Sequence, residues 1–119
     1  MLGFVGLLTI TVARGDHGPV ISLAGEADIT TVPQLAAALA AAADGGARHV
    51  TVDLSALRFA DSATVGALVT ASRSLRAVGG VLELARPQPT VARTLRLLGV
   101  DQVIAVIGDV IADSQPEGA

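Results

Sequence analysis

Residues 49–69, HVTVDLSALRFADSATVGALV, decide the fold of this chain. In the first seven of them, apolar residues alternate with polar ones, which is typical of a half-buried strand. After the acid–hydroxyl pair Asp61–Ser62, apolar residues recur at helical spacing. The stretch therefore predicts a strand over residues 49–55 and a helix that begins close to Ser62.

Two β-rich runs stand upstream of this stretch, LLTITVAR at residues 7–14 and PVISLAG at residues 19–25. The turn-forming sequence GDHG at residues 15–18 joins them, so we expect a β-hairpin.

A helix is predicted between the hairpin and residue 49. Thr30 or Thr31 can cap its start, Pro33 suits its first turn and Gly45–Gly46 ends it. Its expected buried face comprises Val32, Leu35, Ala36, Leu39 and Ala43.

Downstream of residue 62 the alternation of helices and strands continues. The helix that starts there ends at Gly79–Gly80, a short strand covers residues 81–85, a third helix covers 90–99, and a last strand is expected within 102–108. The two helices present as buried faces Val65, Leu68, Val69, Leu75 and Val78, and then Val91, Leu95 and Leu98. A hairpin followed by alternating helices and strands predicts one α/β domain with a mixed sheet of about five strands.

The length of 119 residues fits one domain, which we expect to span residues 1–119. Within it, residues 1–6 form an apolar leader and residues 113–119 a tail, and both are expected to be poorly ordered. The apolar start has no basic residue before it and is too short to span a bilayer, so we interpret it as a strand with a short apolar leader and expect no membrane insertion; a signal peptide is the minority alternative. We expect a cytoplasmic chain, and the lack of cysteine agrees with a reducing cytoplasm.

Composition excludes several classes of function. A net charge of −3 argues against sequence-independent nucleic-acid binding, and the lack of cysteine removes thiol catalysis and cysteine-based metal sites. With only His17 and His49 and no cysteine, a zinc site is rejected. Ala60 and Thr64 stand where a nucleophile elbow around Ser62 needs glycine, and no glycine-rich phosphate loop is present. We therefore expect a protein that is not an enzyme and holds no cofactor.

Asp61 and Ser62 are both good helix caps, although one helix start needs only one. One of the two is then free, and a hydroxyl at a helix N-terminus is a favourable place for a phosphate. From the residues alone, Ser62 is either a cap or a modification site.

Three stretches, taken together, resemble the STAS domain family, and most of all its stand-alone bacterial anti-sigma factor antagonists. They are LAGEADITTVPQL at residues 23–35, VTVDLSALRFADSATVGALV at residues 50–69 and LRLLGVDQVIAV at residues 95–106. They span nearly the whole chain in the order of the family.

The resemblance implies a partner switch. The unphosphorylated antagonist binds an anti-sigma factor that is itself a serine kinase, which frees a sigma factor for transcription; phosphorylation breaks that complex and a phosphatase restores it. By this resemblance Ser62 is the phosphoacceptor, and Asp28, Asp61 and Thr64 share the partner-binding surface. The family usually has Ser or Thr and then Gly after the Asp-Ser pair. Ala63 and Thr64 replace them here, which makes Thr64 a minor alternative acceptor.

A second reading of the same resemblance is a STAS module that binds its partner constitutively, for example as an accessory subunit of a membrane transport complex. The altered residues after Ser62 and the apolar leader favour it. A weak homodimer is compatible with either reading.

Overall fold

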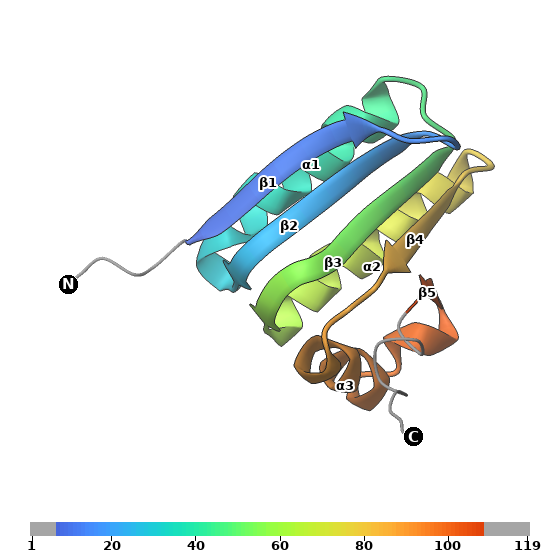
Figure 1. The fold of residues 1–119 in the computed structure, drawn as a ribbon. Coiled ribbons are helices and arrows are strands. Elements are labelled where there is room, and N and C mark those ends of the chain that lie inside the picture. Colours follow the sequence, from blue (N-terminus) through green and yellow to red (C-terminus); the bar gives the residue numbers. More distant parts are fainter. Residues whose placement is uncertain (1–6, 109–119) are drawn as a thin grey trace.

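The computed structural model describes residues 7–108 and shows a five-stranded sheet with the strand order β1-β2-β3-β4-β5 (Figure 1). The strands are β1 (Leu8–Arg14), β2 (Pro19–Ala27), β3 (His49–Ala60), β4 (Val81–Ala85) and β5 (Ala105–Ile107). β1 pairs with β2 in antiparallel fashion, and all other pairs are parallel. The predicted mixed sheet of an α/β domain is confirmed.

Three helices and two short 3₁₀ turns connect the strands. They are η1 (Ile29–Thr31), α1 (Val32–Asp44), α2 (Ser62–Ala77), α3 (Pro89–Leu97) and η2 (Val100–Gln102). α1 and α2 lie side by side behind the sheet, while α3 lies below it and packs against β3 (Figure 1). Because α1 follows β2, α2 follows β3, and β2 and β3 are parallel, both helices begin at the C-terminal ends of these strands, on the same end of the sheet.

The hydrophobic core fills the space between the sheet and the helices. It is aliphatic, as a chain with two Phe and no Tyr or Trp requires. Leucines carry much of the packing: Leu23, Leu35, Leu54, Leu57 and Leu84 are fully buried. Burying such a side chain contributes about 1.5–3 kcal/mol each, so this layer dominates the stabilisation of the fold.

β3 is longer than the sequence indicates, because it continues from Ser55 to Ala60. Its buried residues alternate up to Leu54 and then occur at Leu57 and Ala60, three residues apart. The pairing with β2 shifts register twice along this part, which is the effect of β-bulges. The bulged region leaves Arg58 and Phe59 exposed at the end of the strand.

Gly25 allows β1 to approach β2 closely. Its φ is +103°, and a Cβ there would lie 2.2 Å from the carbonyl oxygen of Leu7, which accepts a hydrogen bond from the N–H of Glu26. A residue with a side chain would therefore displace the start of β1.

Several expectations need correction. Thr31 precedes α1, but neither Thr30 nor Thr31 caps α1 with its side chain, because both hydroxyls bond to Asp28 in the η1 turn. Val78 and Leu98 are exposed C-caps of α2 and α3 rather than parts of their buried faces. Ala36 is also exposed. The last strand is limited to β5, because residues 100–102 form η2 instead. The leader at 1–6 and the tail at 113–119 lie outside the described residues.

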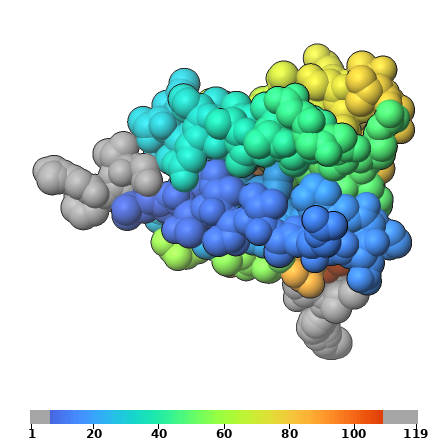
Figure 2. All heavy atoms as spheres, turned by 90° about the horizontal axis from the view of Figure 1, so that it is seen from above, coloured from blue at the N-terminus to red at the C-terminus, as the bar shows by residue number. Residues whose placement is uncertain are grey.

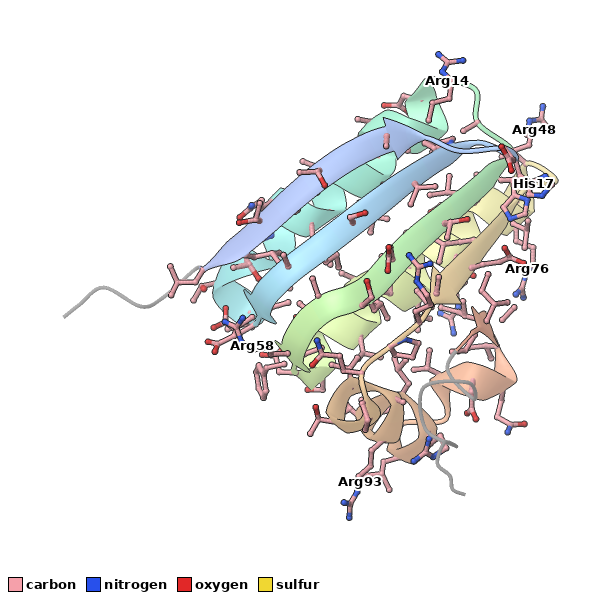
Figure 3. The ribbon with its side chains drawn as sticks, viewed as in Figure 1. Arg14, His17, Arg48, Arg58, Arg76 and Arg93 are labelled. Carbon is pink, nitrogen blue, oxygen red and sulfur yellow. The ribbon has the colours of Figure 1, made fainter. Side chains whose placement is uncertain are left out.

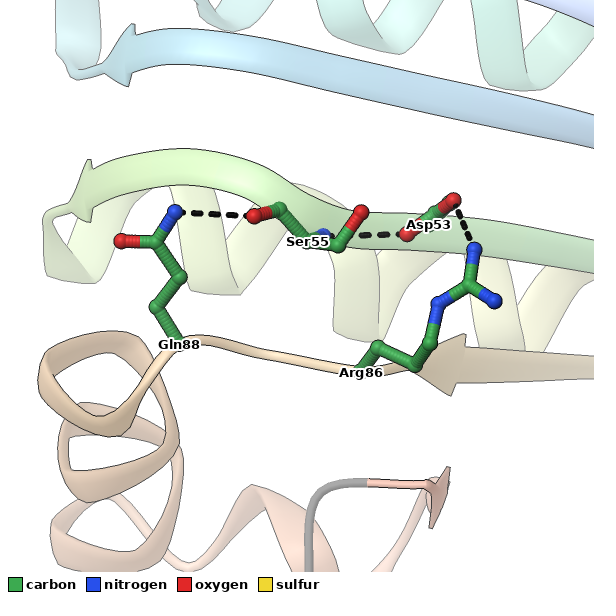
Figure 4. A network of polar contacts seen from close by, with 4 residues as sticks. All are labelled: Asp53, Ser55, Arg86 and Gln88. Carbon is green, nitrogen blue, oxygen red and sulfur yellow. Dashed lines mark hydrogen bonds and ion pairs between the residues drawn. The ribbon is translucent and has the colours of Figure 1, made fainter. Parts of the chain in front are cut away.

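A polar network fastens the loop between β4 and α3 to β3 (Figure 4). The guanidinium of Arg86 forms an ion pair with Asp53, whose other carboxylate oxygen accepts the backbone N–H of Ser55 at 3.0 Å. Gln88 Nε2 donates to the carbonyl oxygen of Ser55 at 2.8 Å. Arg86 adopts a φ of +52°, a left-handed conformation that its contacts with β3 hold in place.

Candidate functional site

The start of α2 is capped by Asp61, not by Ser62. Asp61 Oδ1 accepts the backbone N–H and the hydroxyl of Thr64, both at 2.9 Å. The Asp61 backbone is extended, as in a residue that precedes a helix. Of the two adjacent caps that the sequence offers, the acid is therefore the one in use.

The same carboxylate reaches across to the neighbouring loop. Asp61 Oδ2 accepts the backbone N–H of Ile29 at 3.0 Å, and the Asp61 N–H donates to the carbonyl oxygen of Ala27 at 3.3 Å. Asp28 lies between Ala27 and Ile29 in the chain, and its own carboxylate accepts the backbone N–H of Thr30 at 2.9 Å. The structure thus brings the Asp28 loop next to Asp61 through Ile29, although the two carboxylates themselves cap different turns.

These contacts fix the charge of Asp61. Partial removal from water raises the pKa of this carboxyl, but the hydrogen bonds from Thr64 and from Ile29 outweigh that effect and hold the pKa below its ordinary value. Asp61 is consequently ionised at neutral pH and places a negative charge beside Ser62.

Ser62 is the first residue of α2, and its side chain is exposed. Within residues 7–108 its hydroxyl makes no hydrogen bond, and the backbone N–H groups of Ser62 and Ala63 likewise have no protein acceptor. An exposed hydroxyl next to unpaired N–H groups at the positive end of a helix can carry a phosphate.

Thr64 lies next to Asp61, but it is not part of the exposed surface around Ser62. The side chain is fully buried, and its hydroxyl is engaged by Asp61. Its β-branched side chain points into the fold, so it does not add bulk to the surface around Ser62.

Sequence reasoning missed two exposed apolar residues beside the site. Ile29 follows β2 with 68% of its surface exposed, and Phe59, next to the end of β3, is 50% exposed. Neither residue belongs to a strand or a buried helix face that the sequence predicts, and the loss of alternation after Leu54 is the one sequence signal that Phe59 is exposed. An exposed ion pair between Arg58 and Glu26, at 3.8 Å, lies at the same strand ends and contributes little to stability.

The opposite end of the sheet holds the two histidines. The rings of His17 and His49 stack with their centroids 5.4 Å apart, and His49 Nε2 lies 2.7 Å from Glu83 Oε1. Figure 3 shows His17 near Arg14 and Arg48 at this end, whereas Arg58 lies at the end that carries Ser62. The sequence did not predict this pairing; in the described part of the chain, no group of three or more candidate ligands could hold a metal ion.

None of the helices within residues 7–108 has both the length and the apolar character needed to cross a membrane.

Comparison with known proteins agrees with the fold. A family model described as "Mlab, STAS domain" matches residues 10–108. No curated protein matches the chain.

Several solved structures resemble this one over most of its length. An anti-sigma factor antagonist from Mycobacterium paratuberculosis is 26% identical, with a TM-score of 0.80, covering 93% of this chain and 95% of its own. The anti-sigma factor antagonist SpoIIAA in its unphosphorylated form is 28% identical, with a TM-score of 0.72, and the match covers 87% of this chain and 92% of that one. The Bacillus cell fate determinant SpoIIAA in its phosphorylated form is 27% identical, with a TM-score of 0.65, and 87% and 96% are covered.

Proposed function

This chain belongs to the STAS domain family, and we propose that it is an anti-sigma factor antagonist, a binding protein of the cytoplasm without catalytic activity of its own. In this role it captures an anti-sigma factor that is a serine kinase, and so regulates transcription that depends on a sigma factor. The similarity to anti-sigma factor antagonists at 26–28% identity supports the role.

The observation that carries the proposal is that Asp61 and Ser62 have different roles at the start of α2. Asp61 caps α2, which leaves the Ser62 hydroxyl exposed and without a hydrogen bond to any described residue. A kinase can reach such a hydroxyl without unfolding the helix. Thr64 offers no comparable target, because its hydroxyl is buried and bonded. We therefore assign the phosphate to Ser62.

We define the switch surface as Asp28, Ile29, Phe59, Asp61 and Ser62. Its unphosphorylated form presents Ile29 and Phe59 as apolar contacts for a partner, with exposed Ser62 beside them. A phosphate on Ser62 adds about −1.5 to −2 charges next to ionised Asp61. A partner docked there must then bury a dense negative charge, which costs binding energy.

The phosphorylated form itself is compatible with the fold. The free N–H groups of Ser62 and Ala63 and the helix dipole favour an anion at this position. Phosphorylation should therefore change binding without unfolding the domain, so that a phosphoserine phosphatase can reset the switch.

The proposal is tested with the anti-sigma factor kinases of the same organism. The full chain is incubated with each kinase and ATP, and its peptides are analysed by mass spectrometry; we expect phosphate on Ser62. Binding to the same kinase is then measured for Ser62→Asp and for the matched control Ser74→Asp, an exposed serine further along α2. We expect the first variant to lose binding by about tenfold or more and the second to bind as the wild type does.

Two results would contradict the switch: no phosphate on Ser62 with any kinase, or equal binding by both aspartate variants. Co-purification with a membrane ATPase in place of a kinase would favour the constitutive STAS module. Binding that Ser62→Asp leaves unchanged would then indicate this module rather than the switch.

A further inference from the structure

The outer edge of β1 is open. β1 is the first strand of the sheet, and among the described residues no strand pairs with its outer side. Figure 2 looks onto this edge, where the dark blue atoms of β1 lie at the surface beside α1. Unpaired backbone groups along an edge strand form a template for a further strand.

The hydrogen bonds to β2 show which backbone groups point outward. Gly15 donates to Gly18 at 2.8 Å, and Leu7 accepts from Glu26 at 3.2 Å, so odd-numbered residues of β1 face β2. Even-numbered residues therefore turn their N–H and C=O groups outward. Gln34 Nε2 donates to the carbonyl oxygen of Leu8 at 3.1 Å, which agrees with that direction.

Apart from the Gln34 side chain on the Leu8 carbonyl and the charge of Arg14 at its end, the edge also lacks the features that protect such strands. Residues 8–13, LTITVA, contain no charge, no proline and no glycine, and four of the six are β-branched. The pairing of β1 with β2 has no bulge that would twist the edge away. Val12 is 60% exposed on the side of the sheet that faces α1.

We propose that β1 pairs in antiparallel fashion with β1 of a second copy of this chain, with Thr11 on the two-fold axis. This register uses the full length of the strand and sets outward groups opposite outward groups. It places Ile10 opposite Val12 of the second copy, and the reverse, so that aliphatic residues meet twice. Thr11 meets Thr11 of the second copy, another favourable cross-strand pair.

Charge and space are compatible with this pairing. Arg14 is the only charged residue of β1, and the two copies of Arg14 stand at opposite ends of the strand pair, about 20 Å apart. On the helix side, the row of α1 in line with Gln34 continues as Ala38, Ala41 and Gly45, which leaves room for a neighbouring chain. A hollow of about 490 Å³ lies there, lined by Val12 and the C-terminal part of α1, and it can receive Ile10 of the second copy.

The dimer does not use Ser62, because Ser62 begins α2 after β3, and β2 lies between β1 and β3 in the sheet. The inference therefore stands apart from the proposed function. Since the pairing rests on one strand from each copy, we expect a weak dimer that forms between about 10 µM and 1 mM.

Crosslinking tests the register in the full chain, which contains no cysteine of its own. In Thr11→Cys the two thiols belong to a pair whose Cα atoms lie about 4.5 Å apart, within the range of a disulfide. The matched control is Thr9→Cys, exposed on the same face of β1. Its two copies lie about 14 Å apart in this register, too far for a bond. Under mild oxidation we expect covalent dimers from the first variant and not from the second.

Sedimentation equilibrium tests the association itself. We expect Val12→Lys to raise the dimer Kd by about tenfold or more, because it sets a charge opposite Ile10 of the second copy. The control is Val78→Lys, since Val78 is 58% exposed at the far end of α2, and we expect it to leave the Kd unchanged. A wild-type chain that stays monomeric at about 1 mM, equal effects of the two lysines, or equal crosslinking of the two cysteines would overturn the proposal. If Val12→Lys does not fold, the two cysteine variants still decide the question.

Discussion

Asp61 accepts a hydrogen bond from the backbone N–H of Ile29 at 3.0 Å, so the residue that caps α2 also holds the loop after β2. Its other oxygen accepts from Thr64 in the first turn of α2. One carboxylate thus joins two segments that lie 32 residues apart in the sequence. This relationship makes Asp61 a structural residue of the switch surface as well as a charge on it.

We expect Asp61→Ala to lower the free energy of unfolding by about 2 kcal/mol, because it removes a helix cap and leaves the Ile29 N–H without its acceptor. Asp61→Asn keeps an oxygen that can cap the helix and should lose less. Ser62→Ala is the neighbouring control, since the Ser62 hydroxyl bonds to no described residue. We expect its effect to stay within about 0.5 kcal/mol. Urea unfolding followed by circular dichroism measures all three, and an equal loss for Ser62→Ala would contradict the assignment of the cap.

Stability should fall in acid through Asp53 and Asp61. Partial burial raises the pKa of Asp53, but the hydrogen bonds from Ser55 and the contact with Arg86 outweigh this effect. The pKa of Asp53 therefore lies below the ordinary value of 3.8. The pKa of Asp61 is lowered in the same direction. A carboxyl whose pKa is lower in the folded state stabilises the fold above its unfolded pKa. That contribution is lost as the pH falls through the folded pKa.

The free energy of unfolding, measured in urea between about pH 6 and pH 2, should therefore decline below about pH 4. In the double variant Asp53→Asn/Asp61→Asn, this decline should be shallower although the variant is less stable at neutral pH. An unchanged slope would show that other groups carry the acid sensitivity.

The order of the elements was predictable because each helix ends at a glycine and each buried strand shows a clear apolar pattern. Gly45, Gly79 and Gly99 all follow the helices as expected. The bulged end of β3 was not predictable from the sequence. Two register shifts against β2 change the spacing of the buried residues from two to three after Leu54. A pattern of period three reads as a loop or a helix, and only pairing with β2 makes it a strand.

The sequence singles out Asp61 and Ser62, but it predicts neither their different roles nor the exposed positions of Ile29 and Phe59. Asp61 and Ser62 are equally good caps by residue type, and the contact with Ile29, which decides for Asp61, joins distant parts of the sequence. Burial of Thr64 likewise depends on how α2 packs. The stacking of His17 on His49 is a tertiary contact of the same kind, because α1 separates the two residues in the sequence.

Arg86 provides a test of backbone strain. Its φ of +52° is unfavourable for a residue with a Cβ but not for glycine. Both Arg86→Ala and Arg86→Gly lose the ion pair with Asp53, so their difference isolates the backbone. We expect Arg86→Gly to be more stable than Arg86→Ala by about 1 kcal/mol.

The control for this pair is Arg93, an exposed residue inside α3. There the order should reverse, with Arg93→Ala more stable than Arg93→Gly by about 1 kcal/mol, because glycine is unfavourable in a helix. Thermal unfolding of the four variants measures both differences. The same order at the two positions would mean that Arg86 is not strained.

The exposed position of Ile29 leads to the last prediction, which concerns docking rather than stability. Ile29 is 68% exposed, and its contact with Asp61 uses the backbone, so its side chain is free to contact a partner. Ile29→Glu should therefore leave the unfolding free energy nearly unchanged, yet weaken binding to the anti-sigma factor kinase by about tenfold or more. Val78→Glu is the matched control, because Val78 is 58% exposed at the C-terminal end of α2, whereas the switch surface lies at the start of that helix. Isothermal titration calorimetry of both variants with the kinase compares them under the same conditions. Equal binding by the two would place the docking surface elsewhere, even if Ser62 is phosphorylated, because a phosphoacceptor can be recognised by a kinase without lying inside the stable interface.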